Sequence, residues 1–125
     1  MAGGGGGFRE LEAWRYGMEL AVRVFDVTAE EEDALRPAAL EIPQRIAAGW
    51  MDGRPKIWAR CVALAQGALD RLEAEARRLW AAPDVRLLEL VACARRALDA
   101  LEAAPMRVLE PAAAVDSVEV EAVAA

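Results

Sequence analysis

The sequence predicts an all-α fold, an antiparallel up-down-up-down four-helix bundle. Three observations favour it. Apolar residues recur at steps of three and four in four separate segments, the breaks between these segments are short and carry Pro, Gly or acidic residues, and 125 residues suit a single domain. Because short connections make consecutive helices antiparallel neighbours, we expect a flexible Gly-rich leader at 1–7, the bundle at 8–103 and an acidic Ala/Val-rich tail at 104–125.

The first helix is predicted from Phe8 to about Thr28 and carries two apolar seams. One seam comprises Leu11, Trp14, Met18, Ala21 and Phe25, and the other comprises Ala13, Gly17, Leu20, Val24 and Val27. A single bundle core requires only one such seam. We therefore expect the other to meet a second surface, with Leu20, Val24 and Val27 as candidate residues of an interface between subunits.

The second helix is predicted from the spacing of Leu35, Ala39, Ile42 and Ile46. Pro43 lies deeper than the first turn, so it should bend this helix or remove one backbone hydrogen bond. Gly49 is expected to end the helix, and the segment WMDGRPK to form the following turn.

The third helix, from about Lys56 to Ala82, has the longest regular seam, which comprises Trp58, Val62, Ala65, Leu69, Leu72, Ala76 and Leu79. Pro83 should end it, and Asp84 is the predicted N-cap of a fourth helix. The fourth seam comprises Leu87, Val91, Ala94, Leu98 and Leu101. In the tail, Val118, Val120 and Ala122 alternate as in a short strand, although a frayed tail is the favoured interpretation.

The composition argues against an enzyme. The chain has no histidine, which removes the commonest general base and most zinc or haem ligand sets. Cys61 and Cys93 lack the paired spacing of a metal or redox motif, and we interpret them as small core residues. The acidic run from Glu30 to Asp33 fits a solvated turn better than a metal site. We therefore predict no catalytic residues, no metal and no cofactor.

Charge and hydropathy bear on location and partners. The formal net charge is -6, and four of the 21 acidic residues but no basic residue lie from Val108 onward. The body is therefore nearly neutral. The opening MAGGGGGF lacks the basic and apolar regions of a signal peptide, and no uncharged run is long enough to span a bilayer. These features predict a cytoplasmic location and no membrane partner.

One segment gathers cations and indoles. Its residues are Arg45, Arg54, Lys56 and Arg60 with Trp50 and Trp58, and Asp52 is the acid among them. Cations can bind phosphates and indoles can stack on bases, so this patch is a candidate contact for nucleic acid or another partner. Packing of both indoles in a core or interface is the alternative, and the nearly neutral body disfavours nucleic acid.

Three segments resemble a bacterial four-helix-bundle family, the proteins encoded in intervening sequences of large-subunit ribosomal RNA genes, to which accessory proteins of diversity-generating retroelements are related. The first helix matches at Phe8, Leu11 and Trp14. The second matches a signature resembling Arg-Ala-Ala-Val-Ser-Ile-Pro-Ser-Asn-Ile-Ala-Glu-Gly at Ala38, Ala39, Ile42, Pro43, Ile46, Ala47 and Gly49. The third matches at Ala65, Gly67, Leu69, Leu72 and Glu73.

The resemblance runs from Phe8 to about Ala103 and implies a four-helix bundle assembled as a homopentameric ring. It makes Pro43 a family feature and implies a close approach of neighbouring chain at Gly49. The sequence departs from the family's small polar residues, because Glu41, Gln44, Arg45, Ala48, Ala68 and Arg71 stand in their places. Any site built from those polar residues is therefore altered here.

Two functions follow from these observations. The first is a non-enzymatic, homo-oligomeric scaffold or adaptor that presents a repeated surface to a protein partner or another macromolecule. The alternative is an accessory nucleic-acid-binding subunit with RNA or a reverse transcriptase as its partner, as the resemblance implies.

Overall fold

The computed structural model describes residues 7–28, 34–82 and 84–103. A short 3-10 turn, η1 (Phe8–Glu10), is followed by α1 (Glu12–Val27), α2 (Leu35–Asp52), α3 (Pro55–Leu79) and α4 (Val85–Ala103). These ranges contain four α-helices and no strand, so the predicted all-α class and helix number are confirmed. Nearly all of the predicted leader, the acidic run after Ala29, Pro83 and the tail 104–125 lie outside the described residues.

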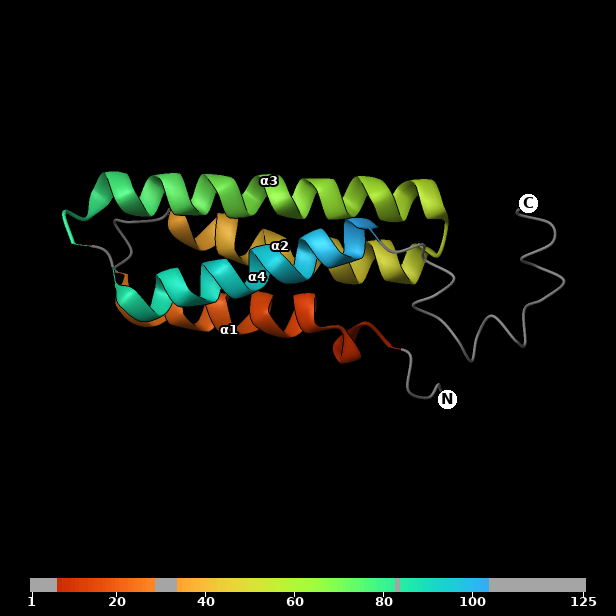
Figure 1. Ribbon diagram of the computed structural model, residues 1–125, viewed down its shortest axis with the longest axis horizontal. Coiled ribbons are helices and arrows are strands. Elements are labelled where there is room, and N and C mark those ends of the chain that lie inside the picture. Colours follow the sequence, from red (N-terminus) through yellow and green to blue (C-terminus); the bar gives the residue numbers. More distant parts are fainter. Residues whose placement is uncertain (1–6, 29–33, 83, 104–125) are drawn as a thin grey trace, which may run out of the picture.

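The helices form an elongated bundle. Figure 1 shows α3 along one edge and α1 along the opposite edge, with α2 and α4 between them. Each helix packs against the helices before and after it in the chain, and α4 closes the bundle against α1. The turn from α2 to α3 therefore lies at the same end as the first turn of α1 and the last turn of α4 (Figure 1).

All four helices contribute to one apolar core. Its largest fully buried side chains are Leu20, Leu35, Ile42, Ile46, Leu69, Leu72, Leu87, Leu98, Val24 and Val62. Burial of each such side chain contributes about 1.5–3 kcal/mol to the free energy of folding. No polar or charged residue of the described segments is buried, so apolar packing dominates the stability of the bundle.

The start of α1 differs from the prediction of one helix from Phe8. Leu11 has an extended backbone, with φ −77° and ψ 132°, and separates η1 from α1. This bend lets the Phe8 ring meet the Trp14 ring edge-on, with centroids 5.4 Å apart. Leu11 and Trp14 both pack on the core, which explains why the chain bends here.

Pro43 lies inside α2 without ending it. Its nitrogen has no hydrogen to donate to the Ala39 carbonyl, so one helical hydrogen bond is missing, while the helix continues from Leu35 to Asp52. The proline is buried opposite Gly17 of α1. A Cβ at Gly17 would lie 3.1 Å from Ile42 Cγ2 and 3.4 Å from Pro43 Cδ, so the absence of a side chain at Gly17 makes room for the proline ring.

The end of α2 corrects a second prediction. Gly53, not Gly49, ends the helix, with a left-handed φ of 83° and a hydrogen bond from its N–H to the Gly49 carbonyl. Gly49 instead marks a close approach of α2 and α3, as the resemblance implied. A Cβ there would lie 2.7 Å from Cys61 Cβ and 3.0 Å from Trp58 Cε3.

Asp84 caps α4 as predicted. Its Oδ1 accepts a hydrogen bond of 2.8 Å from the backbone N–H of Leu87. The same carboxylate binds Arg23 of α1 through two hydrogen bonds of 3.0 and 2.6 Å. One side chain therefore begins α4 and also joins it to α1.

Candidate functional site

The predicted interface residues of the first helix lie largely inside the bundle. Leu20 and Val24 are 0% exposed, and Val27 is half-buried against the core. The seam that contains Gly17 faces inward because Gly17 packs against Ile42 and Pro43. Leu20 and Val24 are therefore unavailable to a neighbouring subunit, and the predicted interface must be corrected.

Of the other seam of α1, Ala21 is buried and Leu11 and Trp14 pack on the core, so only Met18 and Phe25 face outward, together with Val22 of neither seam. Met18 is 37%, Phe25 41% and Val22 57% exposed. We call these three residues the α1 strip. Met18 and Val22 also line an open groove of about 370 Å³. The groove is lined further by Leu90 and by four charged residues, Glu19, Arg23, Asp26 and Arg86, of which Glu19 and Arg86 lie 3.5 Å apart. The sequence revealed two seams but not which of them the core would use.

The two tryptophans of the predicted patch form one packed pair. Trp58 is only 3% exposed, and the half-buried Trp50 ring meets it edge-on, with centroids 5.8 Å apart and planes at 75°. Within the described part of the chain, Trp58 Nε1 has no hydrogen-bond partner. Because Trp58 is enclosed by protein, its ring cannot stack on a base. The prediction that Trp58 belongs to a nucleic-acid or partner patch is therefore wrong.

Two of the four patch cations are paired with acids. Arg45 lies 3.2 Å from Glu41, and Arg54 binds Asp52 through hydrogen bonds of 2.8 and 2.9 Å. The hydrogen bond from Arg54 lowers the pKa of the Asp52 carboxyl. Glu41 lies one helical turn before Arg45 and therefore outside the segment that gathers the cations and indoles, which is why that segment alone did not reveal it as a partner.

Lys56 and Arg60 remain from the predicted patch. Both are exposed, and neither forms an ion pair with a carboxylate of the described segments. Their spacing of four residues places them on one face of α3, near the α2–α3 end of the bundle. This pair is a much smaller cationic surface than the sequence predicted.

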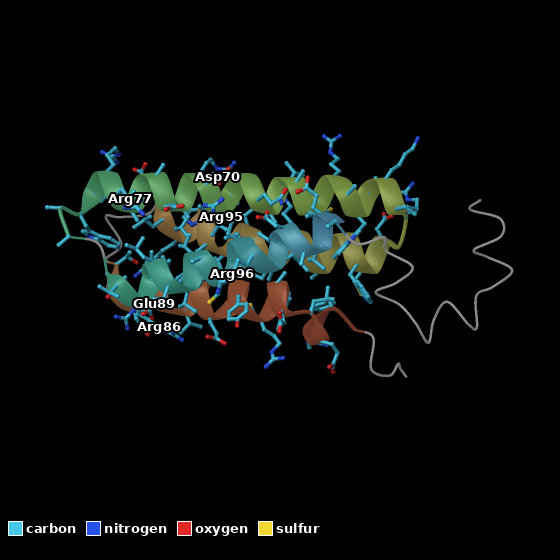
Figure 2. All side chains as sticks on the ribbon, viewed as in Figure 1. Asp70, Arg77, Arg86, Glu89, Arg95 and Arg96 are labelled. Carbon is cyan, nitrogen blue, oxygen red and sulfur yellow. The ribbon has the colours of Figure 1, made fainter. Side chains whose placement is uncertain are left out.

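The faces of α3 and α4 are charged and linked by ion pairs (Figure 2). Arg95 of α4 binds Asp70 at 2.6 Å and Glu73 at 2.7 Å, and Arg77 binds Glu73 at 2.9 Å. Hydrogen bonds from Arg77 and then Arg95 lower the pKa of Glu73. Gln66 donates to Asp99 and Glu102 further along. Ion pairs therefore run along α3 and also join α3 to α4.

The outward face of α2 was missed by the sequence analysis. Its residues, which we call the α2 face, are Pro37, Leu40, Gln44, Ala47, Ala48 and Met51. Ala47 is half-buried and the others are exposed, yet none is charged. At about 100° per residue these six positions fall on one arc of α2, so the helical spacing of the sequence carries the signal for this face.

The described segments offer little chemistry for a reaction. They contain no group of three or more His, Cys, Asp or Glu residues placed to hold a metal. The carboxyl groups with a shifted pKa there are Asp52, Glu73, Glu75 and Asp84, and each is lowered by hydrogen bonds, chiefly from arginine. A lowered pKa keeps a carboxylate ionised, whereas a general acid at neutral pH needs a raised one.

The two cysteines are free thiols. Cys61 is buried at the α2–α3 contact, as predicted for a small core residue, whereas Cys93 is half-buried near Arg96. Neither has histidine beside it, since the chain contains none.

Comparisons with known protein families, curated proteins and solved structures found no significant match. Among the described helices, none combines the length and the apolar character needed to cross a bilayer.

Proposed function

We propose that this chain is a non-enzymatic scaffold or adaptor that acts as an oligomer of helical bundles. The observation that carries the proposal is the α1 strip, in which Met18, Val22 and Phe25 are 37–57% exposed side by side on one helix. Large apolar side chains that gather on a surface mark a contact site. Because α1 already contributes Leu20 and Val24 to its own core, the strip is surplus to the fold of one chain.

The proposed assembly is a homopentameric ring, which is the form implied by the resemblance of Phe8, Trp14, Pro43 and Gly49 to the family of intervening-sequence proteins. Each subunit would then present its charged α3 and α4 faces to a protein partner. The proposed setting is cytoplasmic, because free thiols such as Cys61 and Cys93 persist in a reducing compartment.

The test is the absolute mass in solution, measured by light scattering behind size exclusion. We expect the wild type to exceed one chain and Val22→Glu to have a lower mass, because the substitution places a charge within the strip. Val85→Glu is the matched control, since Val85 is also exposed but lies at the start of α4. A wild type that stays monomeric at all concentrations would refute the proposal.

A second candidate is an accessory nucleic-acid-binding subunit that contacts RNA or a reverse transcriptase. It is favoured only by Lys56 and Arg60, which have no carboxylate partner among the described residues and would recur around an oligomer. Retention of single-stranded RNA over a salt series tests it. Binding that weakens steeply with salt and disappears in Lys56→Glu/Arg60→Glu would support this function, whereas no retention at low salt would exclude it.

A further inference from the structure

The first turns of α3 extend past the end of α4. In the last turns of α4, Asp99 and Glu102 accept hydrogen bonds of 3.1 and 3.2 Å from Gln66 Nε2. Because the two helices are antiparallel, the residues of α3 before Gln66 lie beyond the level at which α4 ends at Ala103 (Figure 1). Measured back to Pro55, this extension is about 16 Å long, from the helical rise per residue. The described part of α4 therefore leaves this stretch of α3 uncovered.

The uncovered stretch presents two cations beside small side chains. We call its four exposed residues, Lys56, Ala59, Arg60 and Ala63, the α3 shelf. Ala63 and Ala59 lie three and seven residues before Gln66, so the helical spacing places them on the face of α3 that meets α4 further along. Lys56 and Arg60 stand beside these alanines. A segment that continues beyond α4 in the same direction would therefore pass over the alanines with both cations at its edge.

The α3 shelf is the cationic end of a helix that is otherwise balanced in charge. Between residues 55 and 69 the only charged residues are Lys56 and Arg60, whereas the rest of α3 carries acids and arginines that form ion pairs. The acid just before α3, Asp52, is bound by Arg54 at 2.8 Å. The shelf thus carries two positive charges that no carboxylate of the described segments balances.

The complementary negative charge belongs to the residues that follow α4. Residues 108–121, which we call the acidic segment, contain no base and four acids: Glu110, Asp116, Glu119 and Glu121. Glu110 follows Ala103 by seven residues, a reach of up to about 23 Å for an extended chain. Lys56 lies about 15 Å along α3 from the level of Gln66. Even the first acid of the segment can therefore reach both cations, and the later acids can do so with chain to spare.

We propose that the acidic segment binds the α3 shelf of its own chain, with its carboxylates paired to Lys56 and Arg60. Exposed ion pairs are individually weak, but the tether gives the segment an effective concentration in the millimolar range, which a free anion must exceed to replace it. The segment thereby withholds the shelf from other anions, single-stranded RNA included. The contact concerns one chain alone, so it goes beyond the proposed scaffold and does not depend on its assembly.

The first experiment locates the acidic segment by paramagnetic broadening in the full chain. A nitroxide is attached through Ser117→Cys, and Cys93→Ser removes the more accessible native thiol, since Cys61 is buried. We expect the amide signals of residues 55–63 to broaden strongly and those of residues 75–79, at the other end of α3, to stay sharp. Salt at about 0.5 M should reverse most of the broadening, because it screens exposed charges. Sharp signals at residues 55–63 in low salt would overturn the inference.

Charge reversal on the shelf provides the matched comparison. Lys56→Glu/Arg60→Glu should abolish the broadening. Arg86→Glu/Arg96→Glu changes the net charge equally and should preserve it, because both arginines are exposed on α4, away from the shelf (Figure 2). Helical circular dichroism checks that each variant keeps the bundle. Broadening that survives Lys56→Glu/Arg60→Glu, or that is lost equally in the control, would overturn the pairing.

A charge exchange and a mixing experiment complete this test. Glu119→Lys/Glu121→Lys, added to Lys56→Glu/Arg60→Glu, reverses both sides of the contact and should restore the broadening; continued absence of broadening would contradict the proposed pairs. Spin-labelled chains without isotope are also mixed with isotope-labelled wild type. Broadening as strong in the mixture as within one chain would show that the segment binds a neighbouring copy, and would overturn the inference.

The second experiment asks whether the acidic segment withholds the shelf. Retention of single-stranded RNA at low salt is compared for the wild type and for a chain in which the four acids of the segment are replaced by their amides. We expect the amide chain to bind RNA more tightly and to lose that gain when Lys56→Glu/Arg60→Glu is added. Equal retention of RNA by the two chains, or a gain that persists without the shelf cations, would overturn the proposed withholding.

Discussion

Gly49→Ala is the sharpest test of how α2 and α3 pack. The added Cβ would lie 2.7 Å from Cys61 Cβ and 3.0 Å from Trp58 Cε3, whereas carbon atoms in contact prefer about 3.5–4.0 Å. Cys61 Cβ is bonded to the backbone and cannot rotate away, so the two helices must separate locally by about 1 Å. Overpacking of this kind costs about 1–3 kcal/mol, and the upper end applies because backbone must move.

The same substitution also has a favourable component. Replacing Gly by Ala inside a helix contributes about 1 kcal/mol, so we expect Gly49→Ala to lower the free energy of unfolding by about 2 kcal/mol overall. Urea unfolding followed by circular dichroism, at one fixed chain concentration, measures this difference. With a urea dependence of about 1–3 kcal/mol per molar, the midpoint should fall by about 1 M.

Gly67→Ala is the control for helix propensity. Gly67 lies within α3, and a Cβ there would meet only Arg71 Nη1, at 3.7 Å. This variant should gain about 0.5–1 kcal/mol in unfolding free energy. If Gly49→Ala were as stable as the wild type or were stabilised like Gly67→Ala, the close approach of α2 and α3 at Gly49 would be refuted.

Three further predictions concern a cap, a helix end and the two thiols. Asp84→Ala should lower the unfolding free energy by about 1 kcal/mol through loss of the N-cap. Hydrogen bonds from Arg23 and the Leu87 N–H lower the pKa of Asp84. The contribution of this carboxylate to the unfolding free energy is therefore complete above about pH 4, the ordinary aspartate pKa, and is lost as the pH falls through the lowered value. A stability difference between wild type and Asp84→Ala that persisted unchanged at about pH 2 would contradict this. Arg36→Met should cost about 1 kcal/mol by removing the donor to the Thr28 carbonyl, and hydrogen exchange should quicken at the end of α1 rather than in α3. A thiol reagent should label Cys93 quickly and Cys61 only as the bundle opens, because Cys61 is buried; equal rates would contradict that placement.

Much of the bundle follows from residue spacing alone. The seam from Trp58 to Ala76 faces the core over the length of α3, because any other rotation would expose its apolar side chains to water. Asp84 could be assigned as a cap because its carboxylate satisfies a backbone N–H that the helix itself leaves without a partner. Such features depend on residues a few positions apart, and the sequence contains them directly.

The choice between the two seams of α1 could not be made in this way. Both are apolar and both have helical spacing, so local pattern does not distinguish Leu20 from Met18. Gly17 distinguishes them only once Ile42 and Pro43 lie against it, which places Leu20 and Val24 inside and the α1 strip outside. Which face of α1 points into the core is therefore set by the packing of α1 against α2.

The candidate cationic site depended in the same way on neighbours that spacing does not reveal. By its spacing Trp58 belongs to the core seam of α3. Packing of both indoles in the core was therefore the stated alternative to a nucleic-acid contact, and Trp58 does pack beside Trp50. The acids that pair with cations are not all close in sequence, since Glu41 binds Arg71 30 positions later. The sequence by itself determined four amphipathic helices and their antiparallel order, because these follow from spacing and short connections. Only the tertiary structure decided which faces remain outside, because a residue is exposed or paired according to what the other helices place beside it.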